Sequence, residues 1–414
     1  MSLPRPRVVL ATLGLLLAVG TAAALTYDGD YTASPQGAVQ PTARPAEAAS
    51  ALRDLEQAVV ARDAERAATL GGASSGAADL LAAIVANAAA LEVADFTLRY
   101  VDETSSVSAD GSWSAAVDMS WRFDGFDAQP VREEVLVRFD RVGQSVGISA
   151  FGGGDRRTPL WLTGPLEVRR DPNTLVLVAG SRQEADLYAR RARAAVPAVR
   201  AVVTDWPGAL VVEVPANAAA LDAMLAAEPG TYANVAAVST SVDGTLTTGA
   251  ATHVFVNPDV YNGLGEAGEQ VVMTHEATHI ATNAPVTSGI PLWLLEGFAD
   301  YVALRDTDLP ISKTAGQILA QVRESGAPDT LPGSAEFDPL ATHLGAAYEA
   351  AWVACLVVAD IAGEDSLVRL YDDVSRGVSI NSALRAHVGL DVSSVTSRWR
   401  QELERLADSA RVAG

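Results

Sequence analysis

The chain has 414 residues, of which 49% are hydrophobic and 20% charged, and its net charge is −21. This composition is typical of a globular protein and excludes a disordered chain, and the length allows two or three domains. The negative charge disfavours nucleic acid and anionic membrane surfaces as partners, because both would repel the protein.

The first 45 residues are predicted to direct export and then to form a linker. Arg5 and Arg7 precede an apolar stretch, residues 8–25, that ends in small side chains. Residues 1–27 are therefore predicted to be a signal peptide or a single membrane anchor. Both alternatives place the rest of the chain outside the cytoplasm, either secreted or anchored to the cell membrane. Residues 28–45 are rich in Pro, Gly, Thr, Ser and Ala, which is typical of an extracytoplasmic linker.

Residues 46–152 are predicted to form an α+β domain. One helix is expected over 46–70, where Leu52 and Leu55 recur at helical spacing, and another over 77–91. Strands rich in β-forming residues follow, separated by Asp and Gly turns, at 96–101, 112–117, 120–123 and 134–139. Helices followed by a curved antiparallel sheet resemble the nuclear-transport-factor-like fold. The sequence of this half shows no catalytic constellation.

Residues 156–414 are predicted to form a second domain, after a boundary at Gly152–Gly154. An α/β layer opens this domain, with helices expected over 184–195 and 217–227. Its strands are expected at 174–178, 209–214, 235–239 and 253–256. The segment 235–242 is expected to form an exposed edge, where an extended peptide could pair with it by strand addition.

The most specific motif is the pattern His-Glu-x-x-His. His275 and His279 lie four residues apart, so a helix places both imidazoles on one face, where they can bind the same ion. Glu276 lies at the edge of that face and is not a ligand. It is predicted to be the catalytic base that takes a proton from a metal-activated water, the role that this pattern assigns to its glutamate.

Glu296 is the predicted third ligand of a Zn²⁺ site, because a catalytic zinc normally takes three protein ligands and one water. The first helix should end near Pro285, and a second helix should begin at Pro291 and carry Glu296 back toward the histidines. Asp300 lies one turn further along the same face. It is predicted to accept the free ring N–H of a zinc-bound histidine, and a solvated helix carboxylate is the alternative.

These residues resemble the gluzincin metallopeptidases, the class that includes thermolysin and the aminopeptidase N-type enzymes. The string Trp293–Ala299 is similar to the second zinc helix of the aminopeptidase N type, and Asp300 matches the aspartate that follows the ligand glutamate in thermolysin-like enzymes. The resemblance implies a gluzincin-type α/β layer and a helical zinc-binding domain. It also implies the ligands and the base, which are His275, His279, Glu296 and Glu276. The chain is similar, too, to secreted actinobacterial proteins of comparable composition.

Two departures from the aminopeptidase N pattern bear on the expected activity. Sixteen residues separate His279 from Glu296, slightly fewer than in those enzymes, which implies a shorter connection. No segment like Gly-Ala-Met-Glu-Asn precedes the first zinc helix, and in aminopeptidases that segment reads the free amino terminus. This departure favours an endopeptidase over an aminopeptidase, and it leaves the choice between the two open.

Tyr348 is the predicted transition-state donor. It opens an apolar helix and lies about as far after Glu296 as the corresponding tyrosine of the aminopeptidase-like family. A hydroxyl aimed at the substrate carbonyl would stabilise the charge that develops there. His343, in a loop-like segment, is the competing donor, and an interface tyrosine is the alternative interpretation of Tyr348. Cys355, on the same helix, is predicted to be a small buried residue rather than a nucleophile.

The sequence thus predicts an exported zinc-dependent peptidase that hydrolyses a peptide or protein substrate by metal-activated water. The alternative is a catalytically silent cell-surface binding or regulatory protein that retains the zinc scaffold, because a scaffold does not guarantee chemistry. The oligomeric state has no signature in the sequence.

Overall fold

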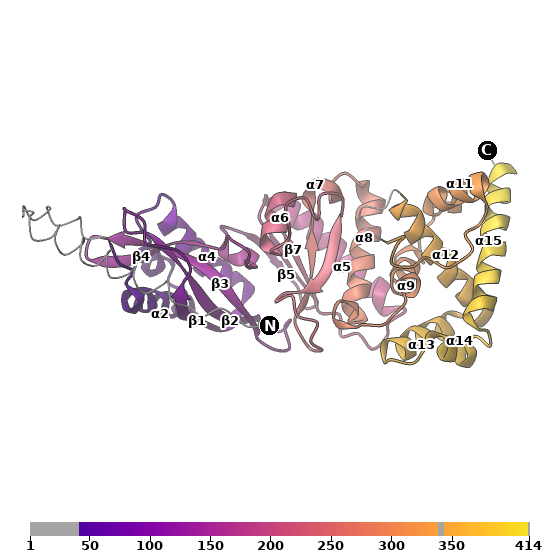
Figure 1. Cartoon of the computed structure of the whole chain (residues 1–414), viewed down its shortest axis with the longest axis horizontal. Coiled ribbons are helices and arrows are strands. Elements are labelled where there is room, and N and C mark those ends of the chain that lie inside the picture. Colours follow the sequence, from indigo (N-terminus) through magenta and orange to yellow (C-terminus); the bar gives the residue numbers. More distant parts are fainter. Residues whose placement is uncertain (1–40, 338–342, 413–414) are drawn as a thin grey trace, which may run out of the picture. The chain divides into compact units, whose positions relative to one another are not determined.

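The computed structural model describes residues 41–337 and 343–412, and the chain divides into two units, residues 1–42 and 43–414. The predicted export segment and most of the predicted linker lie outside the described residues. The second unit contains one antiparallel and one mixed sheet together with many helices (Figure 1). This mixture agrees with the predicted α+β class.

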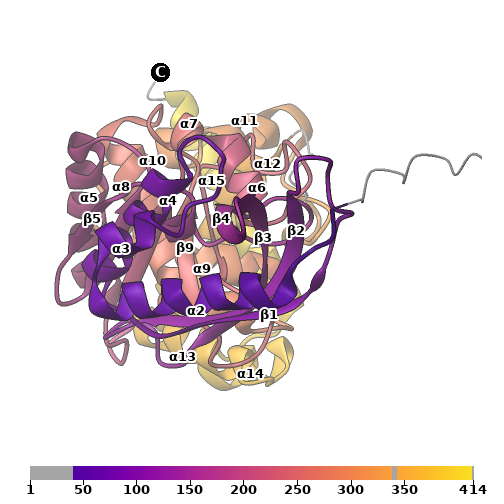
Figure 2. The same ribbon diagram turned by 90° about the vertical axis from the view of Figure 1, so that its left-hand side faces the viewer.

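Helices precede the antiparallel sheet in the chain. They are α2 (Pro45–Ala61), α3 (Ala64–Ala68) and α4 (Ala77–Leu91). The sheet has the strand order β1 (Val93–Glu103), β2 (Trp113–Phe123), β3 (Val131–Val142) and β4 (Ser145–Phe151). In Figure 2, α2 runs along β1, and α2 also contacts β4. Leu52, Leu81 and Phe139 are fully buried in the core of this region.

The helix expected over 46–70 is two helices. The chain leaves α2 at Arg62, whose φ of 55° is left-handed, and Asp63 caps α3 by accepting from the backbone N–H of Arg66 at 2.9 Å. An aspartate is favoured at such a cap because its carboxylate satisfies a free N–H of the first turn. The apolar periodicity therefore predicted helical conformation correctly but did not show the break.

The strand pattern of the first sheet is also corrected in two places. The segments expected at 112–117 and 120–123 form the single strand β2, in which Asp118 and Ser120 occupy the less buried face without interrupting the pairing with β3. Strand β4 is not predicted, because it contains Gly147, and glycine weakens a strand pattern. A side chain at this position would lie 2.6 Å from the carbonyl oxygen of Gly71, so the glycine permits a close backbone approach.

The mixed sheet has the strand order β5-β6-β7-β9-β8. Its strands are β5 (Glu167–Arg170), β6 (Thr174–Val178), β7 (Leu210–Val214), β8 (Ala237–Ser241) and β9 (Thr252–Val256). The strands β6, β7 and β9 are parallel, whereas β5 and β8 pair antiparallel at the two edges. The prediction of an edge strand within 235–242 is therefore confirmed by β8. Strand β5 is not predicted, because its sequence Glu-Val-Arg-Arg lacks a β-forming run.

The two faces of the mixed sheet pack into different cores. Val212 and Val254 belong to the core that contains the helices α5 (Arg182–Arg200) and α8 (Gly265–Ala281). Val211 and Phe255 instead belong to the core of the antiparallel sheet, together with the short helices η1 (Leu160–Leu162) and α6 (Ala218–Met224). Because side chains alternate along a strand, one sheet joins the two cores.

Helices make up the rest of the described chain. After α7 (Pro258–Tyr261) and α8 come η2 (Ala284–Val286), α9 (Leu292–Leu304), α10 (Ile311–Thr314), α11 (Gly316–Ser325), α12 (Leu344–Ala362), α13 (Glu364–Ser375), α14 (Ile380–His387) and α15 (Val392–Val412). Among the described residues, α12 alone is long and apolar enough to cross a membrane, but 56% of its apolar window is buried inside the protein. Ala351, Val353 and Val358 are fully buried, so α12 is a core helix.

Candidate metal centre

The chain bends sharply between the two helices that carry the predicted ligands. Helix α8 ends at Ala281, just before Asn283, whose φ of 54° is left-handed and which is followed by the short helix η2 with Pro285 in its first turn. Asparagine tolerates this conformation better than most residues, and proline cannot continue the α-helical ladder. Helix α9 begins at Leu292, with Pro291 immediately before it as the N-cap rather than within the first turn as predicted. This connection turns α9 back alongside α8.

Three predicted ligands meet between α8 and α9. The Nε2 atoms of His275 and His279 lie 3.0 Å apart, and the Oε2 atom of Glu296 lies 3.3 Å from each of them. The side chains are only 11% to 14% exposed. These residues form a buried group that could hold a metal ion.

The spacing of the ligand atoms fits a tetrahedral ion. Zinc binds histidine nitrogen and carboxylate oxygen at about 2.0–2.2 Å, and tetrahedral angles then place neighbouring ligand atoms about 3.4 Å apart. The observed separations of 3.0 and 3.3 Å are close to that value, so a small adjustment of the side chains would admit the ion. Two imidazoles and one carboxylate also leave a fourth position for water or substrate, as in a catalytic site.

Charges in the site favour a proton when no metal is bound. Burial disfavours a charged imidazole, but the carboxylates of Asp300 and Glu296 outweigh this effect and raise the pKa of His275 well above its usual value. Burial alone would raise the pKa of Glu296, but the two imidazoles hold it below its usual value. Because metal ligands must be deprotonated, metal binding would release a proton from this group.

Asp300 contacts the other nitrogen of His275. Its Oδ1 atom lies 2.7 Å from His275 Nδ1, and it comes from α9, one turn after Glu296. In the neutral imidazole that binds a metal, a carboxylate in this position accepts the Nδ1–H, so that the unprotonated nitrogen is Nε2. The contact that the sequence predicts is therefore present.

The carboxylate of Glu276 lies beside the ligands and points to the edge strand of the mixed sheet. Glu276 is 7% exposed, and its Oε2 atom accepts a hydrogen bond from Ser239 Oγ of β8 at 2.7 Å. Helix α8 contacts β8, and the predicted base contacts the strand that could pair with a peptide. Sequence patterns did not indicate that Ser239 contacts Glu276, because this contact arises only from the packing of β8 on α8.

Tyr348 packs against the candidate metal centre. Its ring centroid lies 6.0 Å from that of His275 and 5.1 Å from that of Phe337. Burial, together with the carboxylates of Glu296 and Glu276, raises the pKa of the Tyr348 hydroxyl far above its usual value. The hydroxyl therefore stays protonated and can donate a hydrogen bond.

The other histidines lie elsewhere. His343, the competing donor, lines a cavity of about 300 Å³ with Ile318 and Trp399. His387 contacts Asp373 at 2.7 Å on the C-terminal helices, and His253 is buried in the mixed sheet. Of the candidate donors, Tyr348 is thus the one whose ring packs on a predicted ligand.

Gly297 lets the two helices that carry Glu296 and Tyr348 approach closely. A side chain at Gly297 would lie 2.3 Å from the carbonyl oxygen of Ala351 and 2.9 Å from the sulfur of Cys355 on α12. Cys355 is fully buried, and burial raises the pKa of its thiol well above the usual value. It is a packing residue of α12, as predicted.

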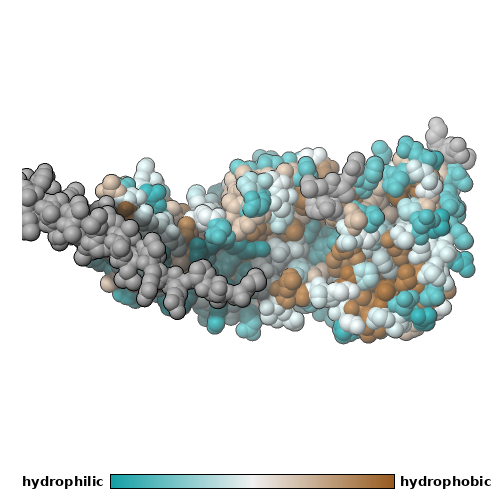
Figure 3. All heavy atoms as spheres, viewed as in Figure 1, coloured by the Kyte–Doolittle hydropathy of each residue, from teal (hydrophilic) through white to brown (hydrophobic). Residues whose placement is uncertain are grey.

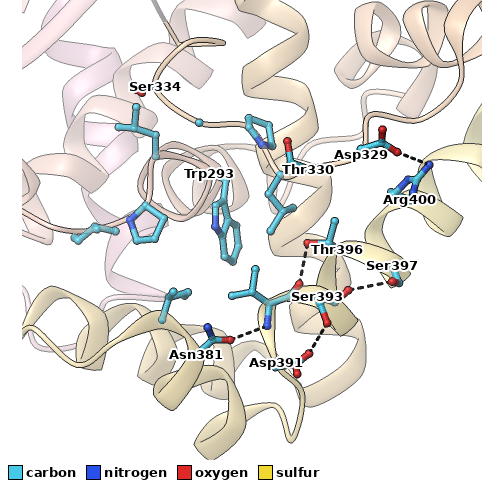
Figure 4. Close-up of a pocket in the computed structure, with 18 of the residues that line it drawn as sticks. Trp293, Asp329, Thr330, Ser334, Asn381, Asp391, Ser393, Thr396, Ser397 and Arg400 are labelled. Atoms are coloured by element: carbon cyan, nitrogen blue, oxygen red, sulfur yellow. Dashed lines mark hydrogen bonds and ion pairs between the residues drawn. The ribbon is translucent and has the colours of Figure 1, made fainter.

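A large cleft lies beside α9 but does not include the metal ligands. It has a volume of about 1090 Å³ and is lined by residues 290–293, by the segment 329–334 and by residues of α14 and α15 (Figure 4). Trp293 forms part of its wall, three residues before Glu296. Figure 3 shows that apolar side chains gather on the visible face of the C-terminal helices. The polar residues of the cleft, such as Asn381 and Arg400, are separate from the metal centre.

Sequence reasoning also missed a buried polar cluster between the two sheets. His253 of β9 contacts Glu213 of β7 at 2.7 Å and Asp127, which precedes β3, at 3.0 Å. Three short segments far apart in the chain meet here, and the apolar strand patterns around them gave no signal for the contact.

The assignment of the candidate site rests on its geometry. No protein-family model matches the chain, and no curated protein matches it in sequence.

Proposed function

We propose that the protein is an exported zinc-dependent peptidase that hydrolyses internal peptide bonds. The observation that carries this proposal is the convergence of His275 Nε2, His279 Nε2 and Glu296 Oε2 within 3.3 Å. Glu276, which follows His275 directly on α8, adds a carboxylate beside them. A bound Zn²⁺ would act there as a Lewis acid on the substrate carbonyl and on water. A gluzincin-type catalytic domain is the fold that this proposal implies for residues 156–414.

Each residue around the proposed ligands would have its own role in the hydrolysis. Glu276 would take a proton from the attacking water and pass it to the leaving nitrogen. Tyr348 would donate a hydrogen bond from its hydroxyl to the carbonyl oxygen of the substrate, on which negative charge develops. Asp300 would hold His275 in the tautomer that exposes Nε2.

Strand β8 supports an extended peptide as the substrate. It is an edge strand of the mixed sheet, and it contacts α8. Its sequence is Ala-Val-Ser-Thr-Ser, so the strand has no carboxylate to pair with the ammonium group of a substrate. This composition favours an endopeptidase over an aminopeptidase.

Metal analysis and turnover test the proposal together. The purified protein should contain one zinc per chain, and a chelator should abolish cleavage of a peptide library until zinc is restored. The double variant His275→Ala/His279→Ala should contain no zinc, whereas His387→Ala, a histidine away from the site, should keep it. A protein without stoichiometric zinc would refute the metal site. A zinc-loaded protein that cleaves no peptide would instead favour the silent binding protein.

A further inference from the structure

Ser239 is the side chain that holds the carboxylate of Glu276. Its Oγ atom lies 2.7 Å from Glu276 Oε2 and 3.1 Å from the backbone oxygen of the same residue. A hydroxyl has one proton to donate, and the shorter contact to a charged acceptor is the stronger one. Glu276 is 7% exposed, so little water competes for this hydrogen bond.

Strand β8 fixes the position of Ser239. Ser239 is paired with Val254 in the middle of the β8–β9 ladder. At the end of β8, Arg157 donates to the carbonyl oxygens of Ser241 at 3.0 Å and Val242 at 3.2 Å. An edge strand has pairing on one side only, and these contacts restrict its movement on α8. The hydroxyl is therefore presented to Glu276 by a fixed strand rather than by a loop.

The hydrogen bond occupies one oxygen of the base and leaves the other. A general base must hold a carboxylate oxygen within hydrogen-bond reach of the proton that it removes. A glutamate side chain has several rotatable bonds, and a free one would spend much of its time in other orientations. A donor on Oε2 selects the orientations in which Oε1 is free for the reacting water.

We propose that Ser239 is a positioning residue that orders the Glu276 carboxylate for proton transfer, which rests on the proposed peptidase function. The hydrolysis itself is unchanged: Ser239 forms no bond to the substrate, and its proton stays on Oγ. Loss of the hydroxyl should therefore lower kcat rather than raise KM, because substrate binding does not use it.

The test compares Ser239→Ala, Ser239→Thr and the control Thr240→Ala in the zinc-loaded full chain. The side chain of Thr240 points to the opposite face of β8, so its removal tests for a general effect on the strand. Ser239→Ala should lower kcat about tenfold to a hundredfold with little change in KM, as expected for a lost hydrogen bond to a charged group. Ser239→Thr, which restores a hydroxyl, should recover most of kcat, and Thr240→Ala should match the wild type.

Crystal structures of the metal-free variants provide a readout that does not need turnover. The Glu276 carboxylate should occupy more than one orientation in Ser239→Ala and a single one in Ser239→Thr. A zinc-loaded Ser239→Ala variant with wild-type kcat would overturn the positioning role. A metal-free Ser239→Ala structure with a single unchanged orientation of Glu276 would overturn it too. The failure of Ser239→Thr to recover kcat would overturn it as well. Absence of cleavage by the wild type would instead refute the peptidase function, and the positioning role with it.

Discussion

Three carboxylates within one small region have different contact partners. Glu296 faces the Nε2 atoms of both histidines, Asp300 contacts the opposite nitrogen of His275, and Glu276 contacts a serine hydroxyl. Each environment suits a different role, namely ligand, orienting group and base. The proposed roles follow from the contacts, because the side chains themselves are chemically almost identical.

Removal of Asp300 should weaken zinc binding without removing a ligand. Asp300→Ala should lower zinc affinity about tenfold to a hundredfold, because His275 loses the acceptor that fixes its tautomer and orientation. Competition with a fluorescent chelator measures this affinity. Asp306→Ala is the matched control, because Asp306 is exposed and its side chain forms an ion pair with the neighbouring Arg305, away from the candidate ligands. Equal zinc affinity in the two variants would remove the orienting role of Asp300.

The hydroxyl of Tyr348 can be tested separately from its ring. Tyr348→Phe should lower kcat about a hundredfold to a thousandfold with KM little changed, the usual cost of losing one oxyanion donor. His343→Ala should have much smaller effects, because His343 lines a separate cavity. Steady-state kinetics on one peptide substrate compare the two. The opposite ranking would assign the oxyanion to His343.

At the scale of secondary structure elements, the site depends on the packing of α9 against α12. One helix carries Glu296 and Asp300, and the other carries Tyr348. Gly297 leaves room for the carbonyl oxygen of Ala351, so the helices approach more closely than side chains would allow. The glycine after Glu296 therefore has a structural reason.

Gly297→Ala should move α12 away from the metal centre. Alanine normally stabilises a helix relative to glycine, but here the added methyl group would overlap the backbone of α12. Overpacking of this kind costs about 1–3 kcal/mol, so the variant should unfold at a lower temperature and lose peptide hydrolysis. Gly316→Ala is the control, because a methyl group there meets nothing within 4 Å. A Gly297→Ala variant as stable and active as the control would contradict the close packing.

Elements with strong local patterns could be predicted, and elements set by tertiary contacts could not. Helix α4 and strand β6 match their expected bounds, because apolar periodicity and β-branched runs identify them. Strand β4 could not be predicted. Its Gly147 is required by the close approach of the Gly71 backbone, which is a tertiary contact. The candidate ligands could be predicted, because they lie in local sequence motifs of two helices. The contact of Ser239 with Glu276 could not, because it depends on which strand packs on α8.

At the scale of the whole unit, residues 43–414, a buried charged cluster links the two sheets. Burial disfavours a charged imidazole at His253, but Asp127 and Glu213 outweigh it and raise the pKa of His253 to about 9. Nearby, burial raises the pKa of Glu133 to about 8, and neither of its carboxylate oxygens has a hydrogen-bond partner within the described residues. This cluster could not be predicted, because its members come from distant strands and turns.

Stability should therefore fall as the pH rises from about 6.5 to about 9. The pKa of His253 in the folded protein, about 9, lies above its ordinary value of 6.5, so the folded state binds more protons in this interval. The contribution of His253 to the free energy of unfolding is fully present below pH 6.5. Up to about 3 kcal/mol of it is lost as the pH rises through the folded-state pKa of about 9. Thermal denaturation of the metal-free protein across this range measures the loss.

Two variants separate the parts of this pH dependence. His253→Gln should be less stable at pH 6.5 and should show a smaller decline toward pH 9. Glu133→Gln should gain stability above pH 8, where the wild type must bury an unpaired charge. A decline of unchanged slope in His253→Gln would contradict the assignment to this histidine.

The most direct test of the peptidase function is the rate of peptide hydrolysis by Glu276→Gln relative to the wild type at equal zinc content. Glutamine keeps the size of the side chain and can still accept from Ser239, but it cannot take a proton. Glu276→Gln should keep its full complement of zinc and lose at least about a hundredfold in kcat, the usual contribution of a general base. A variant with full zinc and wild-type hydrolysis would contradict the proposed peptidase mechanism.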